Sequence, residues 1–193
     1  TRSLSSAASD VYKRQGGNTW GGIDDLFRAG GETWITGSYD PELKLTYWGT
    51  AQQKPWMPAS RSLSIFDAGL FTNSTVAINV DNGDLDWHFQ HVPAEALDLD
   101  EVFERVLIDR GEEKLVFSIG KHGILWKHDR VSGDFIDYKE TIFQNAFTNI
   151  DPNTGEVTYR QDIQNAQIDQ WISVCPSTAV SYTHLRAHET HEH

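Results

Sequence analysis

The feature that most constrains the fold is a repeated turn, in which an aspartate precedes a glycine by a few residues and a strand-like segment follows. Three clear copies are Asp81–Trp87 (DNGDLDW), Asp129–Phe135 (DRVSGDF) and Asp151–Val157 (DPNTGEV). The aspartate can accept hydrogen bonds from the turn backbone, and the glycine can adopt the positive φ that a tight hairpin requires. The pattern therefore predicts a series of β-hairpins.

The spacing of these turns indicates how the hairpins are grouped. A looser copy covers residues 39–49, and the turn aspartates Asp40, Asp81 and Asp129 lie 41 and 48 residues apart. A period of about 40–50 residues with several strands per unit is typical of a β-propeller blade. The strands predicted before the turns are residues 74–80 and 123–128. Because a single blade cannot bury both faces of its sheet, neighbouring blades are required.

We therefore expect an all-β chain that forms a partial propeller of about three blades, fewer than the four or so that the smallest closed propeller needs. The segment Asp98–Ile108 admits two interpretations. Its apolar residues fall at helical spacing, but it is also rich in strand formers. We favour a short acidic turn that runs into a strand, with a helix as the alternative.

Composition and charge exclude several classes of protein. The 193 residues are 38% hydrophobic and include seven Trp, so a packed core is expected. A net charge of −12 argues against a nucleic-acid partner, which needs clustered Lys and Arg. The single cysteine, Cys175, gives no internal disulfide or zinc site, and no apolar run reaches the ~18 residues of a membrane span. Four histidines have no zinc-ligand spacing and are interpreted as polar loop and strand residues: His88, His91, His122 and His128.

Both ends of the chain resemble laboratory sequence. Residues 5–15, SSAASDVYKRQ, back-translate to a string that matches a transposase-based sequencing adapter, and residues 180–190, VSYTHLRAHET, match the reverse complement of the opposite adapter. Such scars are set aside before a fold is inferred. We expect residues 1–15 and 180–193 to be adapter-derived and non-native, and residues 16–179 to be an internal fragment of a longer protein.

A series of motifs in the remaining segment occurs in the order found in one known family. The motifs are Gly30–Pro41 (GGETWITGSYDP), Tyr47–Thr50 with Pro55-Trp56, Trp87–Pro93 with Asp98, Gly120–Arg130, and Ile172–Ala179. Together they resemble the methanol and ethanol dehydrogenases that depend on pyrroloquinoline quinone (PQQ). The resemblance implies an eight-bladed propeller that holds the quinone on its axis, and a periplasmic location.

Two residues match positions at which that family contacts its cofactor. Trp34 matches the tryptophan that forms the floor of the PQQ pocket, where an indole face can stack against the flat quinone. Lys121 matches an Arg or Lys that contacts a quinone oxygen, where an ammonium would stabilise charge on the reduced quinone. The resemblance thus implies that Trp34 and Lys121 bind PQQ.

Three further residues match the family's catalytic and metal-binding positions. Asp98 matches the catalytic base, which takes the alcohol proton while hydride leaves the carbinol carbon. Asp100 stands where lanthanide-using members carry an extra aspartate, although an acidic solvated turn is the alternative interpretation. Gln52 replaces a metal-ligand asparagine and is one methylene longer. The resemblance implies that Gln52, Asp98 and Asp100 hold a calcium or lanthanide ion.

The activity implied by the resemblance is oxidation of a primary alcohol to an aldehyde, with electrons passed to a cytochrome c. A non-catalytic propeller scaffold, such as an outer-membrane assembly protein, and a sugar or polyol dehydrogenase are the alternatives. The repeats fit all three, whereas the Trp34 motif and the Asp98-Leu99-Asp100 sequence favour a dehydrogenase. We expect the parent protein to be an enzyme and the isolated chain to be inactive, because it carries too few blades.

Overall fold

The computed structural model describes residues 16–54, 64–167 and 169–177, and it contains three antiparallel sheets within those ranges. The first sheet has the order β1 (Ser38–Asp40), β2 (Leu45–Gly49), β3 (Ser74–Asn79) and β4 (Leu85–Gln90). The second has the order β5 (Val106–Arg110), β6 (Glu113–Ile119), β7 (Ile124–Asp129) and β8 (Phe135–Glu140). The third pairs β9 (Phe147–Ile150) with β10 (Val157–Tyr159). Short helices are η1 (Gly17–Thr19), η2 (Asp25–Phe27) and α2 (Gln161–Gln164).

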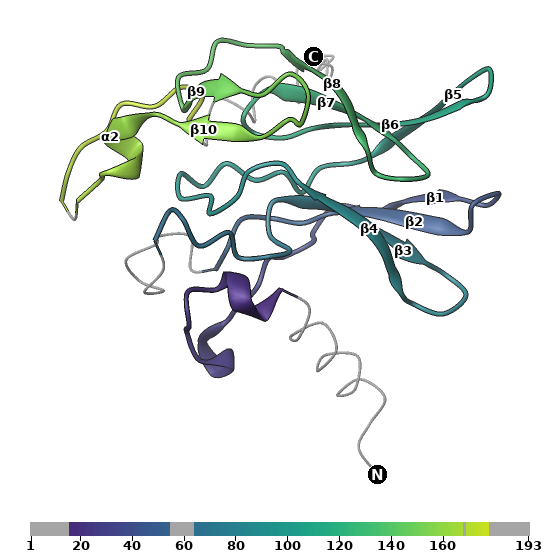
Figure 1. Ribbon diagram of the computed structural model, residues 1–193, viewed down its shortest axis with the longest axis horizontal. Coiled ribbons are helices and arrows are strands. Elements are labelled where there is room, and N and C mark those ends of the chain that lie inside the picture. The colour runs from purple at the N-terminus through teal and green to yellow at the C-terminus, as the bar shows by residue number, and fades with distance from the viewer. Residues whose placement is uncertain (1–15, 55–63, 168, 178–193) are drawn as a thin grey trace, which may run out of the picture.

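The two four-stranded sheets lie one above the other, and the β9–β10 hairpin lies beside the second sheet (Figure 1). Each large sheet is a meander in which every strand pairs with the next in sequence, as in a propeller blade. This arrangement confirms the prediction of an all-β, partial propeller. The predicted strands at 74–80 and 123–128 correspond to β3 and β7, and the looser hairpin forms β1 and β2.

The acidic segment before β5 is a loop and not a helix. Residues 98–105 contain no helix or strand, and the chain becomes extended at Val106. Leu99 and Val102 are nonetheless buried, because the loop lies between the two sheets. The helical alternative is therefore wrong, and the apolar spacing that suggested it reflects burial of an irregular segment.

The turn chemistry that the sequence predicts is present in the second sheet. Asp129 Oδ1 accepts hydrogen bonds from the backbone N–H groups of Val131 and Ser132, at 2.7 and 2.9 Å. Gly133 closes the turn with a φ of 80° and donates its N–H to the Asp129 carbonyl. The same pair of backbone bonds to a carboxylate occurs at Asp40 and Asp151.

The turn between β3 and β4 departs from the predicted pattern. There Asn79 occupies the position of the turn aspartate, since its side chain accepts from the Asp81 N–H and its carbonyl accepts from the Gly83 N–H. The carboxylate of Asp81 instead forms an exposed ion pair with Lys44 at 2.6 Å. The assignment of Asp81 as a turn aspartate is therefore wrong by two positions.

Turn glycines also make contacts between blades. A Cβ on Gly133 would lie 2.6 Å from the indole of Trp87, and one on Gly155 would lie 2.7 Å from the ring of Phe135. In both cases an aromatic residue of one sheet covers the turn glycine of the next. Glycine is required at these positions for space as well as for its positive φ.

Aromatic and aliphatic residues join the first sheet to the second. The shared core contains Leu45, Tyr47, Ala77, Trp87 and Val116. The Tyr47 hydroxyl and the Trp87 indole N–H both donate to the Arg130 carbonyl, at 3.0 and 3.2 Å. Burial of each large side chain stabilises the fold by about 1.5–3 kcal/mol, so the two blades support each other. A second core unites β7 with the third sheet: Val92, Ile124, Trp126, Ala146, Phe147, Ile150, Tyr159 and Ile163.

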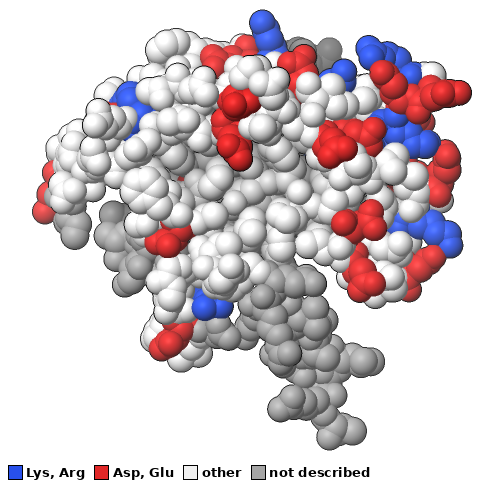
Figure 2. Space-filling view, viewed as in Figure 1, with Lys and Arg blue, Asp and Glu red and all other residues white. Residues whose placement is uncertain are grey.

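Charged side chains gather at the end of the molecule formed by the β1–β2 and β5–β6 turns, where acidic and basic groups alternate (Figure 2). Ion pairs there join Lys44 to Asp81, Lys114 to Glu42 and Arg110 to Glu113. Such exposed pairs contribute little to stability. In the part of the chain that the structure describes, no helix is long and apolar enough to cross a bilayer.

Candidate functional site

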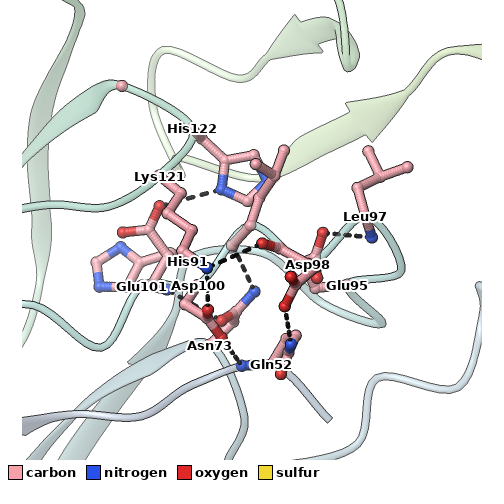
Figure 3. A network of polar contacts seen from close by, with 12 residues as sticks. Gln52, Asn73, His91, Glu95, Leu97, Asp98, Asp100, Glu101, Lys121 and His122 are labelled. Atoms are coloured by element: carbon pink, nitrogen blue, oxygen red, sulfur yellow. Dashed lines mark hydrogen bonds and ion pairs between the residues drawn. The ribbon is translucent and has the colours of Figure 1, made fainter. Parts of the chain in front are cut away.

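A polar cluster lies where three loops meet (Figure 3), at the end of the two large sheets opposite the β1–β2 and β5–β6 turns (Figure 1). The loop after β2 brings Gln52, the loop between the two sheets brings Asp98 and Asp100, and the β6–β7 turn brings Lys121. These residues are up to 69 positions apart in the sequence. Their meeting therefore depends on the packing of one blade against the next.

Gln52 contacts both aspartates. Its backbone N–H donates to Asp100 Oδ1 at 3.0 Å, and its side-chain nitrogen donates to Asp98 Oδ1 at 2.5 Å. The side chain is fully buried, yet its Oε1 has no hydrogen-bond partner among the described residues. A buried amide oxygen without a partner is costly, and it marks a place where a ligand could bind.

Lys121 holds the Asp98–Asp100 loop from the other side. Its Nζ forms an ion pair with Asp100 Oδ2 at 2.6 Å and donates to the Asp98 carbonyl at 3.2 Å. The side chain is 9% exposed. An ammonium has three N–H donors, so one remains for a further acceptor. Lys121 thus neutralises Asp100 and can still donate to a bound molecule.

Asp98 is the more open of the two carboxylates. It is partly exposed, whereas both oxygens of Asp100 are buried against Lys121 and Gln52. Its φ of 59° is unusual for a residue other than glycine, and such backbone conformations cluster at functional sites. The preceding turn is held by Glu95, which accepts the Leu97 N–H at 2.7 Å. Burial raises the pKa of Glu95.

Trp34 lies on a neighbouring loop without joining the polar cluster. The Glu32 carbonyl accepts the Ala51 N–H, and the Gly30 carbonyl accepts the Lys54 N–H, so the Trp34 loop runs beside the Gln52 loop. The indole itself is 46% exposed. An exposed aromatic face on the loop that adjoins the Gln52 loop is suited to stacking against a flat ligand.

Behind the two aspartates lies a second buried layer that the sequence did not indicate. His122 Nδ1 lies 3.2 Å from Glu101 Oε1, and both side chains are fully buried. A Cβ on Gly120 would lie 2.2 Å from the Glu101 carboxyl carbon, so only glycine fits there. The Asn73 amide bonds the backbone on both sides of Asp100.

His91 and His128 are also more buried than expected for polar loop and strand residues, whereas His88 is exposed on β4. Thr75 Oγ1 lies 2.7 Å from His91 Nε2 and accepts from Arg105 Nε at 3.0 Å. Burial holds the pKa of His91 well below its usual range, and the proximity of His128, Arg105 and His122 adds to the effect. Burial likewise lowers the pKa of His128 to about 3. Both rings are therefore neutral near pH 7.

The chemistry of the donor set suits a hard cation. Asp98, Asp100 and Gln52 offer carboxylate and amide oxygens, and one ammonium offsets only one of the two carboxylates. Turning the unpartnered Gln52 Oε1 toward Asp98 would bring two oxygens together, which is favourable only with a cation between them. Among residues 16–54, 64–167 and 169–177, no group of three His, Cys, Asp or Glu could hold a metal alone. Further oxygens would have to complete the roughly six to eight ligands that calcium takes.

Of the five residues predicted for the site, the structure brings four into direct contact: Gln52, Asp98, Asp100 and Lys121. Trp34 lies on the adjoining loop, and no hydrogen bond or ion pair joins it to these four within the described residues. The predicted Pro55-Trp56 motif lies outside the described residues, as do the two terminal stretches and Thr178-Ala179.

Comparison with known proteins gives a consistent result. The family profile "PQQ: Glucose/ethanol/alcohol dehydrogenase, beta-propeller domain" matches residues 10–141. The quinohemoprotein alcohol dehydrogenase ADH-IIG of Pseudomonas putida is 33% identical over 150 residues, which cover 76% of this chain and 19% of the relative. The dehydrogenase subunit of the alcohol dehydrogenase (quinone) of Gluconobacter oxydans (strain 621H) is 33% identical over 162 residues, 81% of this chain and 21% of the relative.

Solved structures share the fold. That of ADHIIG from Pseudomonas putida HK5 matches with a TM-score of 0.70 and 28% identity, over 77% of this chain and 22% of that one. A europium-containing methanol dehydrogenase matches with a TM-score of 0.67 and 24% identity, over 77% of this chain and 26% of that one. The chain thus spans about a fifth to a quarter of the length of the relatives it matches.

Proposed function

Because the chain belongs to the β-propeller family of PQQ-dependent glucose, ethanol and alcohol dehydrogenases, we propose that it forms part of the active site of an enzyme that oxidises a primary alcohol to an aldehyde. The observation that carries the proposal is the buried contact among Gln52, Asp98, Asp100 and Lys121. A propeller that served only as a scaffold would gain nothing from this cluster, because burying the Asp100 carboxylate and the Lys121 ammonium costs free energy.

Within that site, Asp98 acts as the base. Its Oδ1 accepts from Gln52, which leaves Oδ2 to take the proton from an alcohol hydroxyl. Lys121 directs its remaining N–H toward a bound acceptor, and Trp34 offers its exposed indole face for stacking. Bound PQQ would supply the hydride acceptor, with the metal ion as a Lewis acid at its carbonyl.

Gln52, Asp98 and Asp100 are the residues that would hold the metal. The two aspartates leave the cluster with a net negative charge even after Lys121 is counted. A trivalent lanthanide would gain more from this charge than calcium would. We therefore extend the proposal to a lanthanide ion, and we expect calcium to bind more weakly.

A sugar or polyol dehydrogenase with the same cofactor site is the second candidate, because the matched family includes glucose dehydrogenases. The two candidates differ in the loops that cover the substrate.

We further propose that residues 16–179 are the native part of a longer periplasmic protein and that residues 1–15 and 180–193 are adapter-derived. In that protein, electrons pass from reduced PQQ to a cytochrome c.

The test is dye-linked oxidation of ethanol and of glucose by the longer protein, loaded with PQQ and either calcium or lanthanum. Asp98→Asn should lower kcat by about 10²–10⁴-fold, because it removes the base while it preserves shape. Asp86→Asn, an exposed aspartate on β4, is the matched control and should keep the wild-type kcat. An unchanged kcat in Asp98→Asn would disprove the assigned role.

A further inference from the structure

Asn73 occupies a central place behind the candidate site, although it touches none of the groups assigned to catalysis or metal binding. It immediately precedes β3 and is fully buried. Its side-chain amide makes two hydrogen bonds, both to the backbone of the loop that carries Asp100. Figure 3 shows it between the Gln52 loop and that segment.

The two side-chain bonds bracket Asp100. Asn73 Nδ2 donates to the Leu99 carbonyl at 3.3 Å, and its Oδ1 accepts the Glu101 N–H at 3.1 Å. On the opposite edge, the Lys121 N–H donates to the Asp100 carbonyl at 2.9 Å. The backbone at Asp100 is thus held from both sides, which fixes the direction of its carboxylate.

The backbone of Asn73 joins the same residue to the Gln52 loop. Its N–H donates to the carbonyl of Ala51, the neighbour of Gln52, at 2.9 Å. Its carbonyl accepts the His91 N–H, also at 2.9 Å. One residue therefore connects the loop that supplies Gln52 with the loop that supplies Asp98 and Asp100.

The conformation of Asn73 explains why an asparagine suits this position. Its φ of 44° lies in the left-handed region, which asparagine tolerates better than most residues. Only an amide offers both a donor and an acceptor at the reach that the Leu99 carbonyl and the Glu101 N–H require. Glycine would accept the backbone conformation but supply neither bond.

We propose that Asn73 is a positioning residue that sets the Asp100 carboxylate against the Gln52 backbone and Lys121, and through them shapes the cation site. The part that concerns the cation rests on the proposed function. The part that concerns Asp100 rests on these contacts alone, so the two parts can be tested separately.

The first experiment measures amide hydrogen exchange in the full chain and in Asn73→Gly. The Gln52 amide is the diagnostic one, because it donates to Asp100 Oδ1, whereas the Asn73 side chain bonds Leu99 and Glu101. Its protection factor should fall about tenfold in the variant. The net free energy lost with one hydrogen bond corresponds to a change of about tenfold in the equilibrium for local opening. The amides of β6 and β7 should keep their protection and show that the chain remains folded.

The matched control is Asn145→Gly, which removes another asparagine side chain that accepts a backbone N–H, that of Cys175, at 2.7 Å. It should leave the Gln52 amide unchanged. Wild-type protection of Gln52 in Asn73→Gly would overturn the proposal. If Asn73→Gly lost protection throughout β6 and β7, the same comparison would be made with Asn73→Ser, whose hydroxyl is too short to reach both Leu99 and Glu101.

The second experiment titrates europium(III) and calcium alone into the same proteins and follows europium luminescence. Asn73→Gly should bind europium about 10–100-fold more weakly than the wild type, the usual effect of removing a group that orients a metal ligand. Equal affinities would overturn the part of the proposal that concerns the cation. If the wild type bound neither metal while the Gln52 amide lost protection in the variant, the metal part of the proposed function would fail and the positioning role would stand.

Discussion

At the scale of single residues, burial decides the charge state of the histidines behind the candidate site. His91 and His128 are buried beside Phe89 and Trp126, where a charged ring would be poorly solvated. The positive charge of Arg105 disfavours protonation further. Both rings are neutral in the folded chain and gain a proton readily only when it unfolds.

This makes stability depend on pH. Since the pKa of His128 is about 3 when folded and about 6.5 when unfolded, the unfolded chain binds more protons between these values, and stability falls as the pH drops below 6.5. Protonation of His128 in the unfolded chain should lower the free energy of unfolding by about 2 kcal/mol between pH 7 and pH 5. His91 acts in the same direction.

Urea unfolding of the wild type and of His128→Phe at pH 5, 7 and 8 measures this effect. The variant should lose about 2 kcal/mol less than the wild type between pH 7 and pH 5. Neither protein should change through this histidine between pH 7 and pH 8, which serves as the internal control. Parallel losses in the two proteins at pH 5 would refute the assignment of the acid sensitivity to His128.

The candidate site also shows what can be inferred about individual residues from sequence. Gln52, Asp98, Asp100 and Lys121 could be named because they lie in motifs of a known family. The salt bridge between Lys121 and Asp100 could not be inferred, because it joins loops 21 positions apart. Asn73 gave no signal at all, since its partners lie 26 and 28 positions away and its neighbours form an ordinary strand.

At the scale of elements, the turn glycines have two separate requirements that the sequence cannot distinguish. Gly83 and Gly133 occupy the same position in successive turns, with φ values of 79° and 80°. A Cβ on Gly83 would meet no atom within 4 Å, whereas a Cβ on Gly133 would meet the indole of Trp87 at 2.6 Å. The first turn needs only the positive φ, and the second also needs space for the neighbouring blade.

Alanine substitution separates the two requirements. Gly83→Ala should cost about 1–2 kcal/mol of unfolding free energy, from the left-handed conformation alone. Gly133→Ala should cost about 1–3 kcal/mol more, because Trp87 must shift in a packed core. Urea unfolding of both variants gives the difference, and equal costs would show that Trp87 does not constrain the turn.

At the scale of the whole molecule, the two cores formed by the described residues run from Leu45 to Ile163. These cores join successive blades, so the blades stabilise one another as repeat units do. Residues 1–15 and 180–193 lie outside the described residues, and their proposed adapter origin predicts that the native fold does not need them.

Removal of both stretches should therefore change the unfolding free energy by less than about 0.5 kcal/mol, as expected for changes away from a core. Trp20→Ala provides the comparison, because Trp20 is buried and its indole N–H donates to the Leu70 carbonyl at 2.8 Å. That variant should lose about 3–5 kcal/mol. A loss of similar size on removal of the two stretches would mean that they are part of the native fold.

Features that depend on neighbouring residues could be predicted from the amino-acid sequence. The turns at Asp40, Asp129 and Asp151, the strands β3 and β7, and the motifs of the dehydrogenase family are all encoded within short segments. Their physical basis is local, because turn hydrogen bonds and positive φ angles involve residues two to four positions apart.

The tertiary structure alone decided which side chains meet and which are buried. It placed Lys121 on Asp100, left Gln52 Oε1 without a partner among the described residues, and put Asn73 behind the loops that carry Gln52 and Asp100. It also decided that Asn79 takes the turn position assigned to Asp81. These outcomes depend on contacts between loops and blades distant in sequence, and on the space that packing leaves, which no local pattern of residues specifies.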